Sequence, residues 1–201
     1  MSVRILTFVL ASVLAGSVAA AAQTSPAKPA PATTPAAAAK PGQTSPGAGP
    51  VIVVETEKGT FEFETYPNEA PKTVAHIIGL VNKRYYNGQR VHRVVPGFVI
   101  QMGDPATRDM TKQAMWGSGG SGTPVGVAEI SKTRTHVRGA VAMAHAGDAA
   151  KADAQFYVTL AAVPRLDPDY TVFGKIISGM DVVLKIAQTD RIVRVTVRGA
   201  K

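Results

Sequence analysis

Three residues that could act on a substrate without forming a covalent bond lie within one short segment of the sequence. They are Arg93, Phe98 and Gln101, in the run Val-His-Arg-Val-Val-Pro-Gly-Phe-Val-Ile-Gln. A guanidinium stays charged and presents several donors in a planar fork, so Arg93 can stabilise electron density on a bound molecule. The residue types leave two interpretations open, because an arginine that alternates with Val94 is also typical of a solvated strand.

Several other kinds of chemistry are excluded by the sequence. The chain has no cysteine, which rules out disulfides, thiolate catalysis and iron–sulfur ligation. No Gly-x-Ser-x-Gly run marks a hydrolase nucleophile. Residues 117–122 satisfy a G-x-G-x-x-G pattern, but Thr-Pro-Val-Gly follows where a dinucleotide site requires a helix. A flexible loop is predicted there instead.

The histidines do not predict a metal site. No two of them stand at ligand spacing with a nearby set of carboxylates. They are His76, His92, His136 and His145. We therefore expect no metal and no cofactor, which leaves binding and non-covalent catalysis as the chemistry of the chain.

A net charge of +8 would favour a nucleic acid as a partner, but the distribution of the charges weakens this inference. Three basic residues precede Pro50, and every acidic residue follows it, so the later part carries 22 − 3 − 14 = +5. Its basic residues are scattered along the chain. We expect no nucleic-acid partner. A surface that binds an anionic polymer remains as a third, weaker interpretation.

The N-terminal region has the composition of a secretory signal followed by a spacer. Arg4 precedes an apolar run at residues 5–13, and small residues before Gln23 offer a cleavage pattern. We therefore expect a signal peptide at residues 1–22 and export, with the periplasm as the compartment; an uncleaved anchor is the alternative. Residues 23–50 contain no aromatic or large aliphatic side chain and predict a disordered Pro/Ala-rich linker.

The remaining residues, 51–201, predict one folded domain of short strands and two helices. Residues 51–57 and 60–66 read as a hairpin around a Lys-Gly turn. Further strands are expected at residues 91–95, 98–102, 141–144, 155–160, 170–177 and 192–197. Without regular alternation of strands and helices, an antiparallel barrel or sandwich fits better than a doubly wound parallel sheet.

Two amphipathic segments predict the helices. The first begins at Pro71, which suits the first turn of a helix. Its apolar stripe, at helical spacing, consists of Val74, Ile77, Ile78 and Val81. The second helix is expected at residues 181–188.

Several sequence blocks, in order, resemble cyclophilins. The central block is residues 91–104, and the others are residues 70–74, 138–146, 154–158, 170–175 and 179–183. The resemblance covers residues 51 to about 197, and the compact spacing from Gly103 to Arg138 is similar to bacterial members. It implies a mainly β fold, a closed eight-stranded antiparallel barrel capped by two α-helices, with a peptide groove on its outer face.

The resemblance also implies peptidyl-prolyl cis–trans isomerase activity. The Xaa-Pro bond has a rotational barrier of about 18–20 kcal/mol that comes from amide resonance. Arg93 matches the family's catalytic arginine, which donates to the nitrogen of the twisted amide. Gln101 matches the groove glutamine that hydrogen-bonds the substrate backbone and this arginine. No bond breaks, so no nucleophile or cofactor is needed.

Other residues match the family's substrate groove. The pocket for the proline ring is matched by Phe98, Val99, Tyr157 and Leu166. The stretch whose backbone pairs with the peptide like an added strand is matched by Ala144, His145 and Ala146. Gln155 matches another groove position, and Tyr170 matches a site near the proline pocket.

The chain departs from the family pattern at three groove positions. Tyr157 stands where many members have phenylalanine, and Arg165 stands where an aromatic residue is common. The loss of that ring puts cyclosporin sensitivity in question. His145 replaces a residue that is often asparagine or arginine, and we expect it to act through its backbone.

Two functions follow from these residues. The first is an isomerase that accelerates Xaa-Pro isomerisation while exported proteins fold. The alternative is a module that binds proline-containing or unfolded segments with little catalysis. Either function predicts proline-containing peptide segments as partners, a monomer, and no stable membrane insertion once the signal is cleaved.

Overall fold

The computed structural model describes residues 49–199 of the 201-residue chain. The predicted signal peptide, residues 1–22, and the linker up to residue 48 lie outside the described residues. The described strands are β1 (Val51–Thr56), β2 (Gly59–Thr65), β3 (Arg93–Val95), β4 (Val99–Met102), β5 (Ala140–Met143), β6 (Phe156–Thr159), β7 (Val172–Ser178) and β8 (Ile192–Arg198). The α-helices are α1 (Pro71–Asn82) and α2 (Met180–Val183), and 3₁₀ turns lie at Pro105–Arg108, Met110–Met115, Ala149–Lys151 and Pro164–Leu166.

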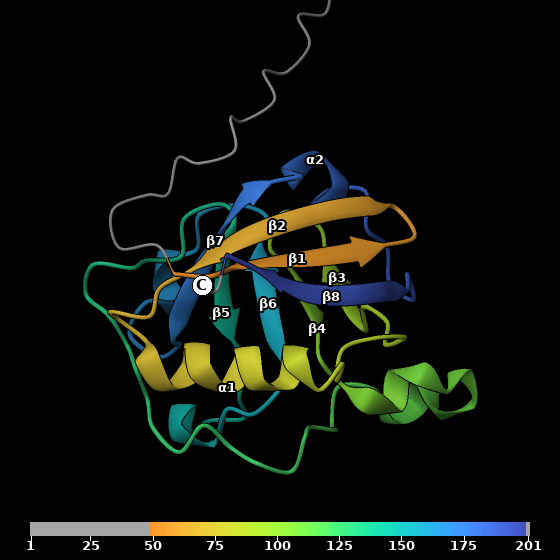
Figure 1. Ribbon diagram of the computed structural model, residues 1–201, viewed down its shortest axis with the longest axis horizontal. Helices are drawn as coiled ribbons and strands as arrows, with labels where there is room; N and C mark the ends of the chain where they lie inside the picture. Colours follow the sequence, from red (N-terminus) through yellow and green to blue (C-terminus); the bar gives the residue numbers. More distant parts are fainter. Residues whose placement is uncertain (1–48, 200–201) are drawn as a thin grey trace, which may run out of the picture. The chain divides into compact units, whose positions relative to one another are not determined.

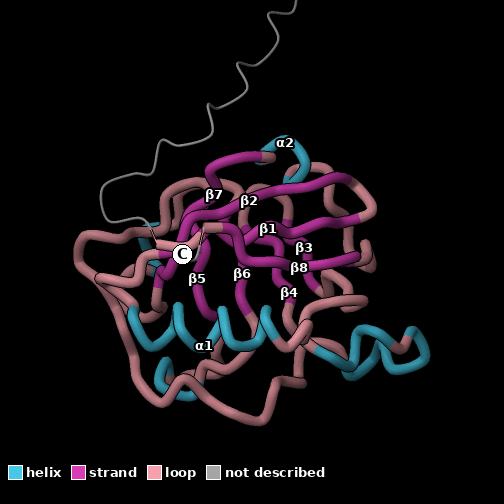
Figure 2. Tube along the Cα trace, in the orientation of Figure 1, coloured by secondary structure: helices cyan, strands magenta, loops and turns pink. Residues whose placement is uncertain are grey.

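The eight strands form one antiparallel sheet in the order β3-β4-β6-β5-β7-β2-β1-β8. The sheet curls strongly, α1 crosses one end of it, and α2 lies at the other end (Figures 1 and 2). Each predicted strand is present within a few residues of its expected position. The mainly β, cyclophilin-like architecture predicted from the sequence is therefore confirmed.

The predicted closure of the barrel is not observed. Within the described residues, the end strands β3 and β8 share no ladder, and a single bridge joins Arg90 to Arg191 beside them. Backbone bonds from Val91 to Asp190 (3.0 Å) and from Ile192 to Gln89 (2.8 Å) accompany that bridge. β3 is only three residues long, so pairing stops there and the sheet is an open half-barrel.

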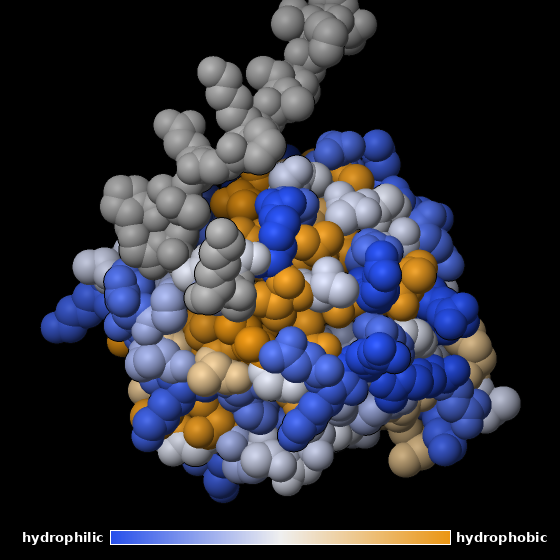
Figure 3. All heavy atoms as spheres, viewed as in Figure 1, coloured by the Kyte–Doolittle hydropathy of each residue, from blue (hydrophilic) through white to orange (hydrophobic). Residues whose placement is uncertain are grey.

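Edge strand β8 carries charged side chains toward solvent. Arg194 pairs with Glu55 at 2.7 Å, and Arg198 pairs with Glu62 at 2.5 Å. Apolar residues gather on the face over β1, β2 and β8, and charged side chains interrupt them (Figure 3). Charges on an edge strand discourage pairing with a second chain.

Helix α1 begins at Pro71, as predicted, but a distant residue caps it. Ala70 offers no capping side chain, and the Glu129 carboxylate instead accepts the backbone N–H groups of Lys72 (3.0 Å) and Thr73 (2.8 Å). An anion at this position satisfies two free donors and complements the helix dipole. The loop containing Glu129 is thereby tied to the helix.

The two predicted helices differ from the expectation in detail. Leu80 is buried on α1, whereas Ile78 from the predicted stripe is only partly buried. α2 is a single turn at Met180–Val183, followed by turns, and not the predicted helix at residues 181–188. Its start at Gly179 requires a left-handed backbone (φ 77°), which glycine adopts without strain.

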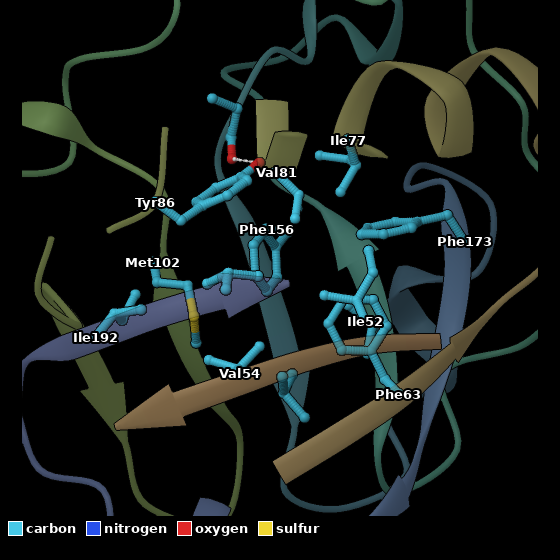
Figure 4. Close-up of a cluster of buried hydrophobic side chains, with 14 of the residues drawn as sticks. Ile52, Val54, Phe63, Ile77, Val81, Tyr86, Met102, Phe156, Phe173 and Ile192 are labelled. Carbon is cyan, nitrogen blue, oxygen red and sulfur yellow. Dashed lines mark hydrogen bonds between the residues drawn. The ribbon is translucent and has the colours of Figure 1, made fainter. Parts of the chain in front are cut away.

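Aromatic side chains fill the inside of the curled sheet (Figure 4). Phe63 lies 6.0 Å from the rings of both Phe156 and Phe173, and Tyr86 lies 5.5 Å from Phe156. The hydroxyl of the fully buried Tyr86 donates to the carbonyl of Ala154 at 3.0 Å. Because side chains pack this interior, a substrate site must lie on the outer face.

A smaller apolar cluster covers that outer face. Its buried members are Tyr66, Val99, Ala140, Ala142, Tyr157 and Val172, and its partly buried members are Phe98, Ala144, Leu166 and Tyr170. Successive residues of a strand face opposite sides. On β4, Ile100 therefore joins the interior while Val99 joins the outer cluster.

Removal of the α1 cap should destabilise the fold. We expect Glu129→Ala to lower the free energy of unfolding by about 1 kcal/mol, as loss of an N-cap does in other helices. Urea unfolding followed by circular dichroism measures the difference. Glu57→Ala, at an exposed turn, is the control and should change stability by less than about 0.5 kcal/mol. Equal stability of both variants would show that the Glu129 contacts contribute nothing.

Candidate active site

Arg93 and Gln101 face each other across the β3–β4 pair. The two residues are register partners, and the Arg93 guanidinium lies 3.4 Å from the Gln101 side-chain oxygen. Gln101 is in turn the register partner of Tyr157 on β6. Arg93 is exposed, so its charge is available at the outer surface of the sheet.

A chain of hydrogen bonds fixes the orientation of the Gln101 amide. Gln155 donates from Nε2 to the carbonyls of Gly117 (2.9 Å) and Gly119 (2.7 Å), which occupies both its amide hydrogens. Its oxygen must therefore accept, and it does so from Gln101 Nε2 at 2.9 Å. This leaves the oxygen of Gln101 directed at Arg93, so the donor is positioned before a substrate arrives.

The glycine-rich stretch is a loop, as predicted from the sequence, and two of its glycines are hydrogen-bonded to the site. The buried carboxylate of Asp104 accepts the backbone N–H groups of Gly117 (2.6 Å) and Gly119 (3.0 Å). A side chain on Gly119 would collide with that carboxylate. Asp104 thus holds in place the carbonyls that bind Gln155.

An outer-face cavity of about 170 Å³ collects most of the predicted site residues. It is lined by Arg93, Phe98, Val99, Gln101, Ala144, His145, Tyr157, Leu166 and Tyr170. Two predicted residues are not in its lining. Gln155 acts one step away, through Gln101, and Ala146 is exposed beyond the cavity.

Two guanidinium groups flank the Phe98 ring. Arg93 lies 5.6 Å from the ring centroid, and Arg165 lies 4.7 Å from it. Cations are attracted to the face of an aromatic ring. Arg165 stands at a position where an aromatic residue is common in cyclophilins, and here a cation lies over the Phe98 ring instead.

His145 contributes its ring as well as its backbone. The ring stacks on Tyr170, with centroids 4.3 Å apart, and its Nε2 lies 2.9 Å from the carbonyl oxygen of Asp169. We expected a role for the backbone alone. The stacked pair instead makes one wall of the cavity.

Sequence reasoning missed two residues behind the cavity, His136 and Asp167. The Tyr157 hydroxyl lies 2.9 Å from His136 Nε2, and His136 Nδ1 lies 2.7 Å from Asp167. One signal was available, because a buried tyrosine in place of phenylalanine needs a partner for its hydroxyl. Burial lowers the pKa of His136, and the hydrogen bond to Asp167 opposes that shift in part.

Arg93 and Gln101 also line a second cavity, of about 500 Å³. Met115 and Trp116, from the segment after Asp104, form part of its lining, together with His92 and Val94. Met115 is largely exposed. The two central residues of the site therefore line both cavities.

Neither a metal cluster nor a membrane span is found in the part of the chain that the structure describes. No group of three or more His, Cys, Asp or Glu side chains is placed to hold a metal ion there. No helix among residues 49–199 is long and apolar enough to cross a membrane.

An apolar cavity on the outside of a curled antiparallel sheet, with an arginine and an oriented glutamine at its edge, defines a protein of the cyclophilin class. The family model described as "Cyclophilin type peptidyl-prolyl cis-trans isomerase/CLD" matches residues 51–199. The chain therefore belongs to this family, whose members are enzymes that isomerise peptidyl-prolyl bonds.

Curated relatives agree with this assignment. A protein of Brucella abortus (strain 2308) named "Probable peptidyl-prolyl cis-trans isomerase" is 42% identical over 149 residues, which cover 72% of this chain and 76% of the relative. "Peptidyl-prolyl cis-trans isomerase B" of Bacillus subtilis (strain 168) is 38% identical over 139 residues, which cover 69% of this chain and 91% of the relative.

Solved structures support the fold. A Cryptosporidium parvum cyclophilin-type isomerase, crystallised in the presence of the dipeptide Ala-Pro, has a TM-score of 0.66 and 24% identity. The similarity covers 74% of this chain and 99% of that protein. The cyclophilin AquaCyp293 from Hirschia baltica has a TM-score of 0.62 at 22% identity, with 73% of each chain covered.

Stability should fall as the pH drops below 6.5. Burial lowers the pKa of His92 and of His136 from 6.5. In this window the unfolded chain therefore binds more protons than the folded one, and the free energy of unfolding decreases with decreasing pH. Each histidine can change the free energy of unfolding by at most about 1.4 kcal/mol per pH unit. Urea titrations at about pH 7.5 and about pH 5.5 measure the difference; unchanged stability would contradict the burial of neutral rings.

Proposed function

We propose that the cavity around Arg93 is the active site in which this chain isomerises Xaa-Pro bonds. The proline ring occupies the apolar part formed by Phe98, Val99, Tyr157 and Leu166. The planar amide resists rotation, with a barrier of about 18–20 kcal/mol. As the amide twists, its nitrogen regains a lone pair, and the guanidinium of Arg93 donates to that nitrogen.

One observation carries this proposal: the guanidinium of Arg93 is exposed at the cavity and has no carboxylate partner within the described residues. Its hydrogen bond is with the neutral Gln101. The same guanidinium lines the apolar cavity and lies 5.6 Å from the centroid of the Phe98 ring. A charged donor beside an apolar pocket, bonded to an oriented amide, favours the role of a donor over that of a solvated strand residue.

The catalytic principle is differential binding. A donor aimed at the pyramidal nitrogen stabilises the twisted amide and contributes little to the planar ground state, so it lowers the barrier. Stabilisation by about 7 kcal/mol corresponds to about a 10⁵-fold acceleration. No covalent intermediate is required, and Gln101 directs the guanidinium while the apolar walls hold the ring.

Ala144, His145 and Ala146 extend the site along the peptide. They follow β5, and the backbone N–H of Ala144 bonds the carbonyl of Gln155 at 2.9 Å. We propose that a substrate segment pairs with this stretch as an added strand. The side chains of the substrate segment then lie beside Gln155 and the glycine-rich loop, while its proline enters the cavity.

The proposed substrates are proline-containing segments of exported proteins as they fold. This proposal is supported by the secretory composition of residues 1–22 and the spacer composition of residues 23–50. We further propose that the isomerase works as a monomer in the periplasm. Every side chain that lines the proposed site belongs to one chain, so the site needs no residue from a second copy.

The isomerase proposal predicts a large effect at Arg93. Xaa-Pro exchange in a short peptide, measured by NMR, should be accelerated by the wild type and reduced by at least about tenfold in Arg93→Ala, which removes about 1.4 kcal/mol or more of barrier lowering. Arg138→Ala, which removes an exposed arginine outside the cavity lining, is the matched control and should retain the wild-type rate.

Two results would contradict this prediction. If folded wild type binds the peptide without accelerating exchange, the chain is a proline-binding module. If Arg93→Ala and Arg138→Ala have equal rates, Arg93 is not the donor. Amide spectra of both variants establish that they are folded before rates are compared.

Export predicts a defined mature N-terminus. Expressed in a Gram-negative host, the full chain should be recovered from the periplasm with Ala21 or Gln23 as its first residue, as mass spectrometry reads it. Leu10→Arg interrupts the apolar run and should leave full-length chain in the cytosol. Recovery of the uncut wild type in the membrane fraction would instead show an anchor, and uncut soluble protein would contradict export.

A further inference from the structure

Tyr157 is connected through His136 to Asp167 behind the cavity. The distances are 2.9 Å from the Tyr157 hydroxyl to His136 Nε2 and 2.7 Å from His136 Nδ1 to Asp167 Oδ1. The backbone N–H of His136 donates to the same carboxylate oxygen at 2.7 Å. The His136 side chain is completely buried, so no water replaces either partner of its ring.

The direction of the hydrogen bonds follows from the acidity of the groups. Burial raises the pKa of Asp167, but the hydrogen bonds from the backbone and ring of His136 outweigh it and lower the pKa overall, so the carboxylate accepts. Nδ1 of His136 then carries the ring proton, and Nε2 is left as an acceptor. Burial raises the pKa of Tyr157, so its hydroxyl stays protonated and donates to Nε2.

This direction turns the hydroxyl of Tyr157 away from the proline ring. The hydroxyl hydrogen is committed to His136, and the tyrosine ring lines the cavity. A tyrosine at this position can therefore form the same apolar wall as the phenylalanine that many cyclophilins have there. The apolar character of the wall depends on the histidine behind it.

His136 also joins two walls of the cavity. Tyr157 lies on β6, whereas Asp167 directly follows the 3₁₀ turn Pro164–Leu166, which carries Leu166 and Arg165. The carbonyl of His136 accepts the backbone N–H of Val163, just before that turn, at 2.7 Å. The His136 ring stacks on the Tyr157 ring with an interplanar angle of 15°. One buried side chain thus sets the spacing between the walls.

We propose that His136 and Asp167 are positioning residues of the isomerase site: they hold the Tyr157 hydroxyl and the Leu166 turn so that the cavity fits a proline ring. This inference rests on the proposed function. It assigns a role to two residues that do not touch the substrate and act through Tyr157 and Leu166.

The arrangement has a consequence at acid pH. Protonated His136 carries hydrogen on both nitrogens, so the bond to Tyr157 must reverse and the hydroxyl hydrogen must turn elsewhere. The titratable groups facing the His136 ring are Asp167, Tyr157 and, edge-on at 6.4 Å, Tyr170. The Tyr157 side chain then presents a polar hydrogen to the cavity or moves, and the affinity of the cavity for the proline ring falls.

The experiment compares KM and kcat of Xaa-Pro exchange between about pH 7.5 and about pH 5.5. In the wild type we expect KM to rise by about threefold or more at the lower pH, with a smaller change in kcat, because the ring is bound less well while Arg93 is unaffected. In Tyr157→Phe, KM should stay level across this range, because no hydroxyl remains to be reversed.

Variants of His136 and Asp167 test the coupling. His136→Phe should raise KM at every pH when Tyr157 is present and have little further effect in the Tyr157→Phe background, which is a double-mutant cycle. Asp167→Asn keeps an acceptor oxygen and should restore most of the affinity lost in Asp167→Ala. ¹⁵N spectra of the wild type at neutral pH should show His136 with its proton on Nδ1.

Distinct results would overturn the inference. An acid rise in KM that persists in Tyr157→Phe, or that disappears in His145→Gln, would assign it to a group other than the His136–Tyr157 pair. Additive effects in the cycle would show that His136 is only structural. If the wild type binds peptide but does not accelerate exchange, the proposed function fails instead, and the same pH comparison on peptide Kd still tests the inference.

Discussion

The alternation of side chains along β4 and β6 is the constraint on which the site depends. On β4, Val99 and Gln101 face outward while Ile100 and Met102 enter the interior. On β6, Tyr157 faces the cavity and Phe156 packs against Phe63 at 6.0 Å. A shift of one residue in the pairing of these strands would exchange the two sets. The aromatic interior therefore fixes the register, and the register places the site.

Strand register explains how much of the fold could be predicted from the sequence. The hairpin of β1 and β2 was readable because its alternation and turn are local. Closure was not readable, because the pairing of Arg90 with Arg191 depends on where segments about a hundred residues apart meet. The sequence predicted the end of α2 at residue 188, whereas the helix ends at Val183, and the reason is similar. Its apolar residues continue the pattern, but the chain turns after Val183 to reach β8.

The residues of the candidate site that lie in one block of sequence could be predicted. Those that depend on contacts with residues far away in the sequence could not. Arg93 and Gln101 lie eight residues apart and become register partners through one short turn. Asp167 lies 31 residues from His136, and no periodicity connects them. The same holds for Glu129, which caps α1 from 57 residues away. Side-chain bonds between remote loops leave no pattern in sequence beyond the presence of a suitable residue.

Orientation before binding is what links these remote contacts to catalysis. Asp104 fixes the glycine stretch, the glycine carbonyls fix Gln155, and Gln155 orients Gln101 toward Arg93. On the other side of the cavity, Asp167 and His136 hold Tyr157 in the same manner. A donor that is already aimed needs no reorganisation as the amide twists, so more of its interaction energy lowers the barrier. The two relays of hydrogen bonds, each ending in a carboxylate, thus orient the side chains of a shallow surface cavity.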